Sequence, residues 1–219
     1  MDLACTAQVF LPNMNKQNLH LEIFTDFVCP WCYLATAVVA RLQQQYPDLK
    51  VTWLPFPLHP STPPEGMLLS EMLPGVNLEA AHRRLYALMD ELGLEHGQRN
   101  HTYNSRLAQE LAMWAETRAG GAALTALLYR AYFVDNSNLA DPAILLALVN
   151  QAGLDEEQAM DVLDKRSFSA VVDASWDKAK RLRITGIPTF IAGGFQMTGF
   201  QPLEELQRFV EYTREKQKP

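Results

Sequence analysis

Two cysteines separated by two residues carry the strongest chemical signal in the sequence. Cys29 and Cys32 enclose Pro30 and Trp31 in a Cys-Pro-Trp-Cys motif. The thiolate is the nucleophilic form of cysteine, and two thiols at this spacing can exchange a disulfide with another molecule. We expect Cys29 to be exposed and to attack a substrate disulfide. We expect Cys32, one helical turn later, to be buried and to resolve the mixed disulfide.

Zinc binding is the main competing chemistry for such a cysteine pair. A structural zinc ion takes four ligands, so a second pair would be needed. The sequence offers no second pair of standard spacing among its remaining cysteine and histidines: Cys5, His20, His59, His82, His96 and His101. No metal is therefore predicted. A passive free thiol is the favoured interpretation of Cys5, and a redox role is the alternative.

A β-α-β unit is predicted to position the cysteine pair. Residues 19–25 alternate apolar and polar side chains at their start and indicate a strand, residues 30–46 have helical periodicity, and residues 50–56 indicate a second strand. Pro30 suits the first turn of a helix. This placement puts Cys29 at a helix N-terminus, where unpaired N–H groups and the helix dipole stabilise a thiolate.

A second group of strand signals lies near the other end of the chain. Pro188 follows Gly186-Ile187 at the start of a predicted strand over 188–192, which is compatible with a cis peptide bond. Gly193-Gly194 then predicts a hairpin to a strand over 195–198. A final amphipathic helix begins at Pro202.

The middle of the chain is predicted to be helical. Residues 57–78 are rich in proline and indicate an irregular connection. Helical spacing or capping residues then predict helices over 80–92, 105–118, 122–134, 143–152, a short segment after Asp155, and 168–183.

With these elements in place, the sequence resembles the thioredoxin superfamily. Within it, the sequence is similar to the DsbA-like group and its FrnE-like branch, the 2-hydroxychromene-2-carboxylate isomerase/DsbA family. The similarity extends from about residue 19 to 210, and these stretches carry it: Asp26 to Tyr33, Pro55 to Leu58, Pro64 to Gly66, Arg130 to Phe133 with Asn138 and Asp141, Thr185 to Phe190, and Gly199 to Pro202.

The resemblance implies an α/β thioredoxin fold with an inserted all-helical domain. The implied parts are a first half over 15–60, the helical insertion over 61–167 and a second half over 168–219. In this family the cis-proline loop packs against the redox pair and presents backbone to the substrate. The implied site residues are the nucleophile Cys29, the resolving Cys32 and the cis-proline Pro188, with Pro30, Trp31, Asp26 and Ile187 as neighbours and Ile187 and Thr189 as substrate contacts.

One position departs from the thioredoxin pattern. Many such enzymes have a buried acid six residues before the nucleophilic cysteine, and here that residue is Ile23. Asp26 is the better candidate for the missing proton transfer, although turn formation or helix capping is its favoured interpretation. Trp31 is interpreted either as an aromatic shield of the disulfide or as a substrate contact.

Three functions are weighed. The cysteine pair favours a thiol–disulfide oxidoreductase acting on protein or small-molecule thiols and disulfides, with a recycling reductant or oxidant as partner. The alternative is a glutathione-dependent isomerase or kappa-class glutathione transferase, which typically has serine at the position of Cys29. A non-catalytic chaperone or assembly subunit is the third hypothesis, and a reactive pair before a helix argues against it.

The composition and the first residues limit which partners and which cellular compartment we expect. Of the residues, 48% are hydrophobic and 20% are charged, with a formal net charge of −6. No basic cluster suited to nucleic acid and no membrane-spanning apolar run is present in the sequence. The first residues do not have the pattern of a secretory signal, so a cytoplasmic location is expected. No tightly bound cofactor is expected; glutathione is considered as a co-substrate, and a homodimer is left open.

Overall fold

The central sheet joins strands from the two ends of the sequence. The computed structural model of the protein describes residues 19–216. Across these residues the main sheet has four strands in the order β2-β1-β5-β6. β1 pairs with β2 in parallel, while β5 is antiparallel to both β1 and β6. The strands are β1 (His20–Thr25), β2 (Lys50–Pro55), β5 (Thr189–Ala192) and β6 (Phe195–Thr198).

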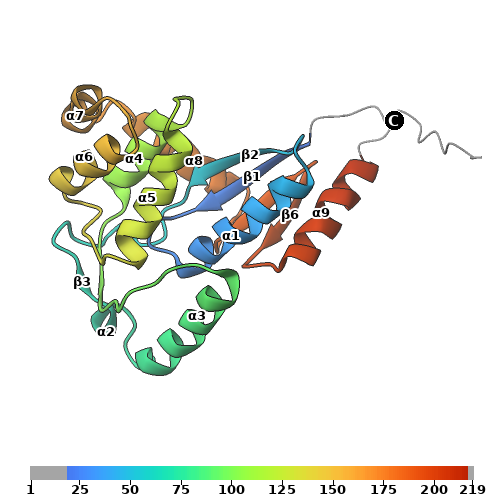
Figure 1. The fold of residues 1–219 in the computed structure, drawn as a ribbon, viewed down its shortest axis with the longest axis horizontal. Helices are drawn as coiled ribbons and strands as arrows, with labels where there is room; N and C mark the ends of the chain where they lie inside the picture. Colours follow the sequence, from blue (N-terminus) through green and yellow to red (C-terminus); the bar gives the residue numbers. More distant parts are fainter. Residues whose placement is uncertain (1–18, 217–219) are drawn as a thin grey trace, which may run out of the picture.

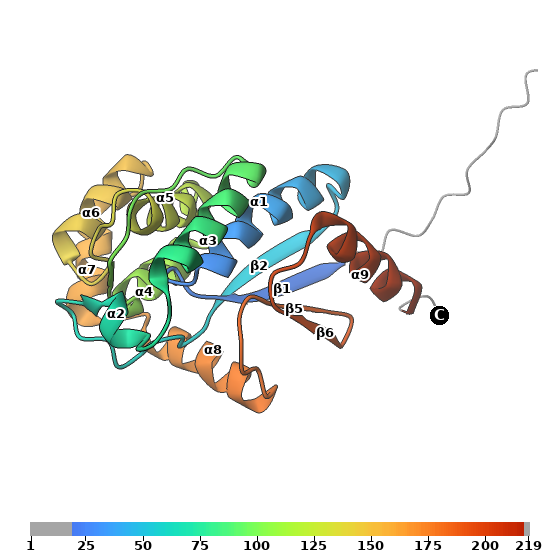
Figure 2. The same cartoon turned by 90° about the horizontal axis from the view of Figure 1, so that it is seen from below.

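Helices cover both faces of this sheet. α1 (Pro30–Gln45) and α9 (Leu203–Lys216) lie on one face, and α8 (Ser169–Arg181) lies on the other (Figures 1 and 2). Apolar side chains of α1 and α9 share one buried cluster with the strands. Together with the β1-α1-β2 crossover, this arrangement is the predicted thioredoxin-type α/β fold.

The other long helices pack in two different places. α4 (Arg106–Ala115), α5 (Gly121–Phe133), α6 (Pro142–Gln151) and α7 (Glu156–Lys165) gather beyond the end of β1, at the left of Figure 1. α3 (Leu78–Leu92) instead packs against α1. A second buried cluster runs from the start of α1 into α5. The helical layer therefore packs directly on the part of α1 that carries the cysteines.

Capping residues predicted from the sequence lie at the N-termini of two of these helices. The Asp141 side chain accepts from the N–H of Ala143 at the start of α6, and Pro142 occupies its first turn. The Asp155 side chain accepts from the N–H of Gln158 in α7. Each cap satisfies an N–H group that has no partner inside its helix.

The connection over 57–78 is more regular than predicted. It contains β3 (Met67–Leu68), which pairs with β4 (His101–Thr102), and the single-turn α2 (Leu69–Met72). Two-residue strands are too short to show a periodic pattern. α3 begins two residues earlier than predicted, because the Asn77 side chain accepts from the N–H of Ala80.

The division into 15–60, 61–167 and 168–219 stays a prediction, and its residues 15–18 and 217–219 lie outside the described part of the chain. Within residues 19–216, no helix combines the length and the apolar character needed to cross a membrane.

Candidate active site

The Cys-Pro-Trp-Cys motif forms the turn between β1 and α1. Cys29 is the N-cap residue of α1, and Pro30 occupies the first helical turn. The N–H of Cys29 donates to the carbonyl of Asp26 at 3.1 Å, and the N–H of Cys32 donates to the carbonyl of Cys29 at 3.1 Å. Both cysteines are free thiols. The pair therefore lies at the helix N-terminus that the sequence predicted.

The loop before β5 lies against the first cysteine. The Ile187–Pro188 peptide bond is cis. The Cys29 thiol donates to the carbonyl oxygen of Ile187, with a sulfur–oxygen distance of 3.8 Å. The Pro188 carbonyl accepts from the N–H of Gly199 at 2.7 Å, which ties the loop to the residue after β6. Two segments 158 residues apart thus meet at the Cys29 sulfur.

The expectation that Cys29 is exposed is wrong in this structure. Cys29 is only 3% exposed and Cys32 is fully buried, whereas Trp31 is 41% exposed. The Trp31 ring lies 6.4 Å from the ring of Phe200, centroid to centroid. The indole ring of Trp31, rather than either cysteine sulfur, therefore lies at the surface of the motif.

Burial controls the protonation of the second cysteine. It raises the pKa of the Cys32 thiol well above its usual range, and the adjacent Cys29 acts in the same direction. The Thr25 side chain and the backbone of Asp26 lower the pKa of Cys32 and so oppose this shift. Cys32 therefore holds its proton at neutral pH and must lose it before acting as a nucleophile.

Asp26 is a buried acid with both carboxylate oxygens occupied. Oδ1 accepts from the N–H of Val28 at 3.2 Å, a contact that closes the turn before the cysteines. Oδ2 accepts from the N–H of Leu58 and from the side chain of Gln109, each at 3.1 Å. Burial raises the pKa of Asp26 to about 6, and hydrogen bonds led by that of Ser105 oppose the shift. The carboxylate is thus a turn residue that titrates near neutral pH.

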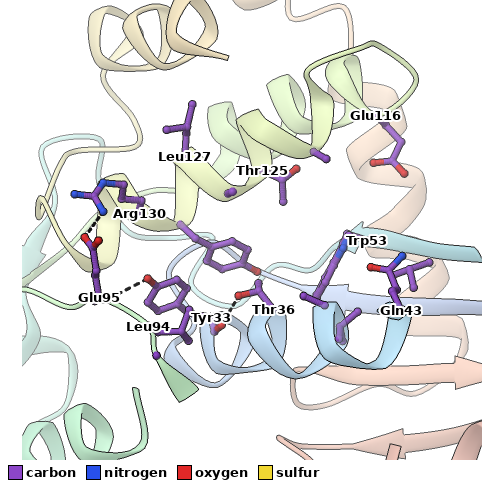
Figure 3. A pocket seen from close by; sticks show the side chains of 17 residues that line it. Tyr33, Thr36, Gln43, Trp53, Leu94, Glu95, Glu116, Thr125, Leu127 and Arg130 are labelled. Atoms are coloured by element: carbon purple, nitrogen blue, oxygen red, sulfur yellow. Dashed lines mark hydrogen bonds and ion pairs between the residues drawn. The ribbon is translucent and has the colours of Figure 1, made fainter. Parts of the chain in front are cut away.

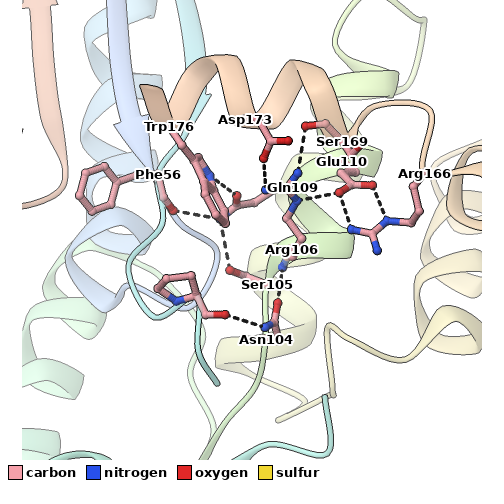
Figure 4. Close-up of polar contacts among 11 residues, drawn as sticks. Phe56, Asn104, Ser105, Arg106, Gln109, Glu110, Arg166, Ser169, Asp173 and Trp176 are labelled. Carbon is pink, nitrogen blue, oxygen red and sulfur yellow. Dashed lines mark hydrogen bonds and ion pairs between the residues drawn. The ribbon is translucent and has the colours of Figure 1, made fainter. Parts of the chain in front are cut away.

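Gln109 of α4 connects Asp26 to the helical layer, and its contacts with Phe56, Ser105 and Trp176 are drawn in Figure 4. Its side-chain N–H groups donate to Asp26, to the Phe56 carbonyl at 3.0 Å and to the Ser105 hydroxyl at 3.2 Å. Its oxygen accepts from the indole N–H of Trp176 in α8 at 3.0 Å. The side-chain amide of Gln109 therefore connects the loop after β2, α4 and α8 around the active-site turn.

An ion cluster around the buried Glu110 extends this network away from the cysteines (Figure 4). The fully buried carboxylate of Glu110 pairs with Arg106 and Arg166, each at 2.7 Å. Arg106 also pairs with Asp173 at 2.8 Å and lies 4.5 Å from the Trp176 ring. Burial alone would raise the pKa of Glu110, but the hydrogen bonds from Arg166 and Arg106 hold it below its usual value.

The two predicted substrate contacts have different surroundings. Ile187 is 7% exposed and offers its carbonyl to Cys29. Thr189 is fully buried, and its hydroxyl donates to the Gly186 carbonyl at 2.7 Å. Its backbone lies between β1 and β6. The Thr189 side chain therefore supports the cis-proline loop from inside, and its role as a substrate contact stays a prediction.

Thr25 and Tyr129 belong to the site, although sequence reasoning missed both. Their hydroxyl groups lie 2.5 Å apart. The Tyr129 ring packs 4.9 Å from that of Phe27 and 5.8 Å from that of Tyr33. Tyr129 lies on α5, 104 residues from Thr25. Nothing in the local pattern of either segment indicates that the two hydroxyls meet.

A cavity of about 560 Å³ lies beside the site, between α1, β2 and α5 (Figure 3). Tyr33 of α1, Trp53 of β2 and Tyr129 of α5 are among its lining residues. Arg130 pairs with Glu95 at one side. Across residues 19–216 no group of three or more His, Cys, Asp or Glu side chains is arranged to hold a metal ion. Cys5 lies outside the described residues.

Comparisons with known proteins agree with this geometry. A family model described as a DSBA-like thioredoxin domain matches residues 20–211. The uncharacterized protein YwbO of Bacillus subtilis (strain 168) is 26% identical over 185 residues, covering 83% of this chain and 90% of that protein. A probable DsbA oxidoreductase, SCO1869 of Streptomyces coelicolor, has a similar structure with a TM-score of 0.85 and 26% identity over 92% of each chain.

Two further solved structures share the fold at lower identity. A 2-hydroxychromene-2-carboxylate isomerase has a TM-score of 0.71 and 18% identity, covering 90% of this chain and 97% of that one. The cytosolic disulfide reductase DsbM of Pseudomonas aeruginosa, solved with glutathione, has a TM-score of 0.63 and 20% identity, covering 90% of this chain and 100% of that one.

Proposed function

Because this chain belongs to the DSBA-like thioredoxin domain family and is an oxidoreductase of that family, we propose that it exchanges disulfides through Cys29 and Cys32. The contact between the Cys29 thiol and the Ile187 carbonyl, next to a cis-proline, carries the proposal. It brings the predicted nucleophile to the predicted substrate-binding loop.

The proposed reaction has two steps. The Cys29 thiolate attacks a substrate disulfide R–S–S–R′, forms a Cys29–S–S–R bond and expels R′S⁻. The Cys32 thiolate, after losing its proton, attacks the Cys29 sulfur and expels RS⁻, which leaves a Cys29–Cys32 disulfide. The substrate gains two electrons and the protein loses two. The reverse sequence oxidises a substrate dithiol.

Single-cysteine variants test this mechanism. Cys29→Ser is expected to abolish reduction of a protein disulfide such as that of insulin. Cys32→Ser is expected to accumulate a mixed disulfide that mass spectrometry detects and dithiothreitol releases. The proposal fails if both variants keep full activity. The captured partners would identify the substrate class.

We further propose the FrnE-type reaction on protein or small-molecule thiols, with glutathione as co-substrate or recycling reductant. The disulfide reductase solved with glutathione supports glutathione chemistry on this fold. The alternative is a glutathione-dependent isomerase, which the isomerase with the same fold supports. A glutathione-dependent isomerisation that needs no Cys32 would favour this alternative.

A cytoplasmic location is proposed with that chemistry, because the neighbour that was solved with glutathione is described as cytosolic. Fractionation of cells that express the chain at its native level tests the location. Light scattering of the purified protein tests the homodimer.

A further inference from the structure

Arg99 is a buried cation, and no carboxylate of residues 19–216 forms an ion pair with it. Its side chain is almost fully covered, and Nη1 donates to the Tyr132 hydroxyl at 2.6 Å. The guanidinium lies 4.8 Å from the centroid of the Tyr132 ring and 4.9 Å from that of Phe133. Two aromatic faces attract the charge but supply no anion, so the charge of Arg99 is only partly compensated.

Arg99 lines a cavity of about 830 Å³ beside α3, the helix at the bottom of Figure 1. The other lining residues come from α3, from the segment before β4 and from the turn after α5: Glu79, His82, Arg83, Tyr86, Gln98, Asn100 and Asn136. None of them lines the cavity between α1, β2 and α5. The cavity beside α3 is therefore separate from the one beside the cysteines.

The lining of this cavity carries one net positive charge at neutral pH. Glu79 and Arg83 form an exposed pair at 3.3 Å and cancel each other. Burial lowers the pKa of His82, and the charge of Arg99 lowers it further, so the imidazole is neutral. The charge of Arg99 remains. A ligand with a single negative charge would balance it.

Two polar atoms of the lining residues also lack partners within the described part of the chain. The Tyr86 hydroxyl and Oδ1 of Asn136 are buried and make no hydrogen bond. Leaving a buried polar group unpaired is unfavourable. The Tyr86 ring stacks between the rings of His82 and His96, with centroids 5.4 and 4.2 Å away. An amide oxygen can only accept, so Asn136 requires a donor, whereas the phenol can donate to an acceptor.

We propose that this cavity binds a small 2-hydroxy carboxylate. The Nε and Nη2 groups of Arg99, which make no hydrogen bond to residues 19–216, bind the two carboxylate oxygens. The ligand hydroxyl donates to Oδ1 of Asn136 and accepts from the Tyr86 hydroxyl. An ammonium group in place of that hydroxyl would add a positive charge near Arg99, so a hydroxy acid fits better than an amino acid. The inference goes beyond the proposed function and does not depend on Cys29.

Lactate is the probe, and binding to the full-length protein is followed by the amide NMR resonances of the labelled protein. Acetate has the same charge but no hydroxyl, L-alanine has an amine instead, and inorganic phosphate is a different anion. All are compared at one ionic strength, because salt screens charges. Lactate is expected to bind about fivefold more tightly than acetate, the equivalent of one hydrogen bond. It is also expected to bind more tightly than L-alanine or phosphate.

Arg99→Gln is expected to weaken lactate binding by about tenfold or more, the range for hydrogen bonds to a charged group. The matched control is Arg208→Gln. Arg208 is an exposed arginine on α9 that pairs with Glu205 and does not line the cavity. This control loses the same charge and is expected to bind lactate as the unmodified protein does.

Two further variants keep the test decisive if Arg99→Gln does not fold. Asn136 has a φ of 52°, which glycine adopts without strain, so Asn136→Gly keeps the turn. It is expected to remove the preference for lactate over acetate and to leave acetate binding unchanged. Tyr86→Phe removes an unpaired buried hydroxyl, so it is expected to raise the melting temperature of the ligand-free protein while weakening lactate binding. A purely structural role would alter stability without altering the preference between the two anions.

Equal binding of lactate and acetate by the unmodified protein overturns the proposal. So does an undiminished preference for lactate in Asn136→Gly, or undiminished lactate binding in a folded Arg99→Gln. Tighter binding of phosphate than of lactate would assign the cavity to a different class of anion and overturns it as well.

Discussion

At the scale of single residues, Asp26 shows how one position combines structural and chemical roles. Its carboxylate closes the turn before Cys29 and anchors Gln109, yet burial raises its pKa to about 6. The usual value is 3.8, so the folded protein binds this proton more tightly than the unfolded chain does. Folding is therefore favoured by the protonated form, and stability falls as pH rises from about 4 to 6.

Asp26→Asn removes this dependence. The unfolding free energy of the unmodified protein minus that of the variant is expected to fall by about 2 kcal/mol between pH 4 and 7, because at pH 4 the carboxyl of the unfolded chain has already lost part of its proton. Urea unfolding at stepped pH measures it. Asp164→Asn, at an exposed position on α7, is the control and should show no such trend. A difference that rises with pH would contradict the assignment.

The cysteine pair and the cis-proline loop were predictable because their signals are local. A Cys-Pro-Trp-Cys motif between a strand and a helix, and a Gly-Ile-Pro before a strand, need only a few residues to be recognised. Thr25, Gln109 and Tyr129 carry no such signal, because their roles depend on contacts over 83 to 104 residues. The burial of Cys29 was missed for the same reason, since Ile187 lies 158 residues away.

At the scale of elements, Glu110 joins α4 to Arg166 at the C-terminal end of α7. This carboxylate is fully buried between Arg106 and Arg166, while its neighbour Gln109 holds Asp26. Replacing this carboxylate removes the charged acceptor of both guanidinium groups. The network therefore couples packing of the helical layer to the position of the active-site turn.

Glu110→Gln is expected to lower the unfolding free energy by about 2 kcal/mol, within the range for hydrogen bonds to charged groups. The control, Glu79→Gln, breaks the pair with Arg83 on α3, whose side chains are 89% and 74% exposed. It should cost less than about 1 kcal/mol. Urea denaturation compares the two. Equal, small effects would show that the cluster does not hold α4 in place.

At the scale of the whole molecule, the segment after α3 ties the sheet side to the helical layer. The N–H of Gly97 donates to the carbonyl of Phe133 at the end of α5, at 2.8 Å. A Cβ atom at Gly97 would lie 2.1 Å from the carbonyl oxygen of Val134. Because that neighbour is backbone, the close approach requires glycine.

Gly97→Ala is expected to destabilise the protein by about 3 kcal/mol or more, since backbone has to move to remove the overlap. Gly186→Ala is the control, because its Cβ would meet a Thr198 methyl at 3.6 Å, an ordinary contact. Thermal unfolding followed by circular dichroism measures both. Equal melting temperatures would show that the segment adapts without cost.

The 158-residue separation between Cys29 and Ile187 also affects the chain during its synthesis. A ribosome adding about 5–20 residues per second reaches Ile187 roughly 8–30 s after Cys29. For that time the nascent chain has neither the Ile187 carbonyl nor β5, the strand that pairs with β1. The two thiols are then open to any oxidant near the ribosome, so the finished site is assembled only in the last stage of translation.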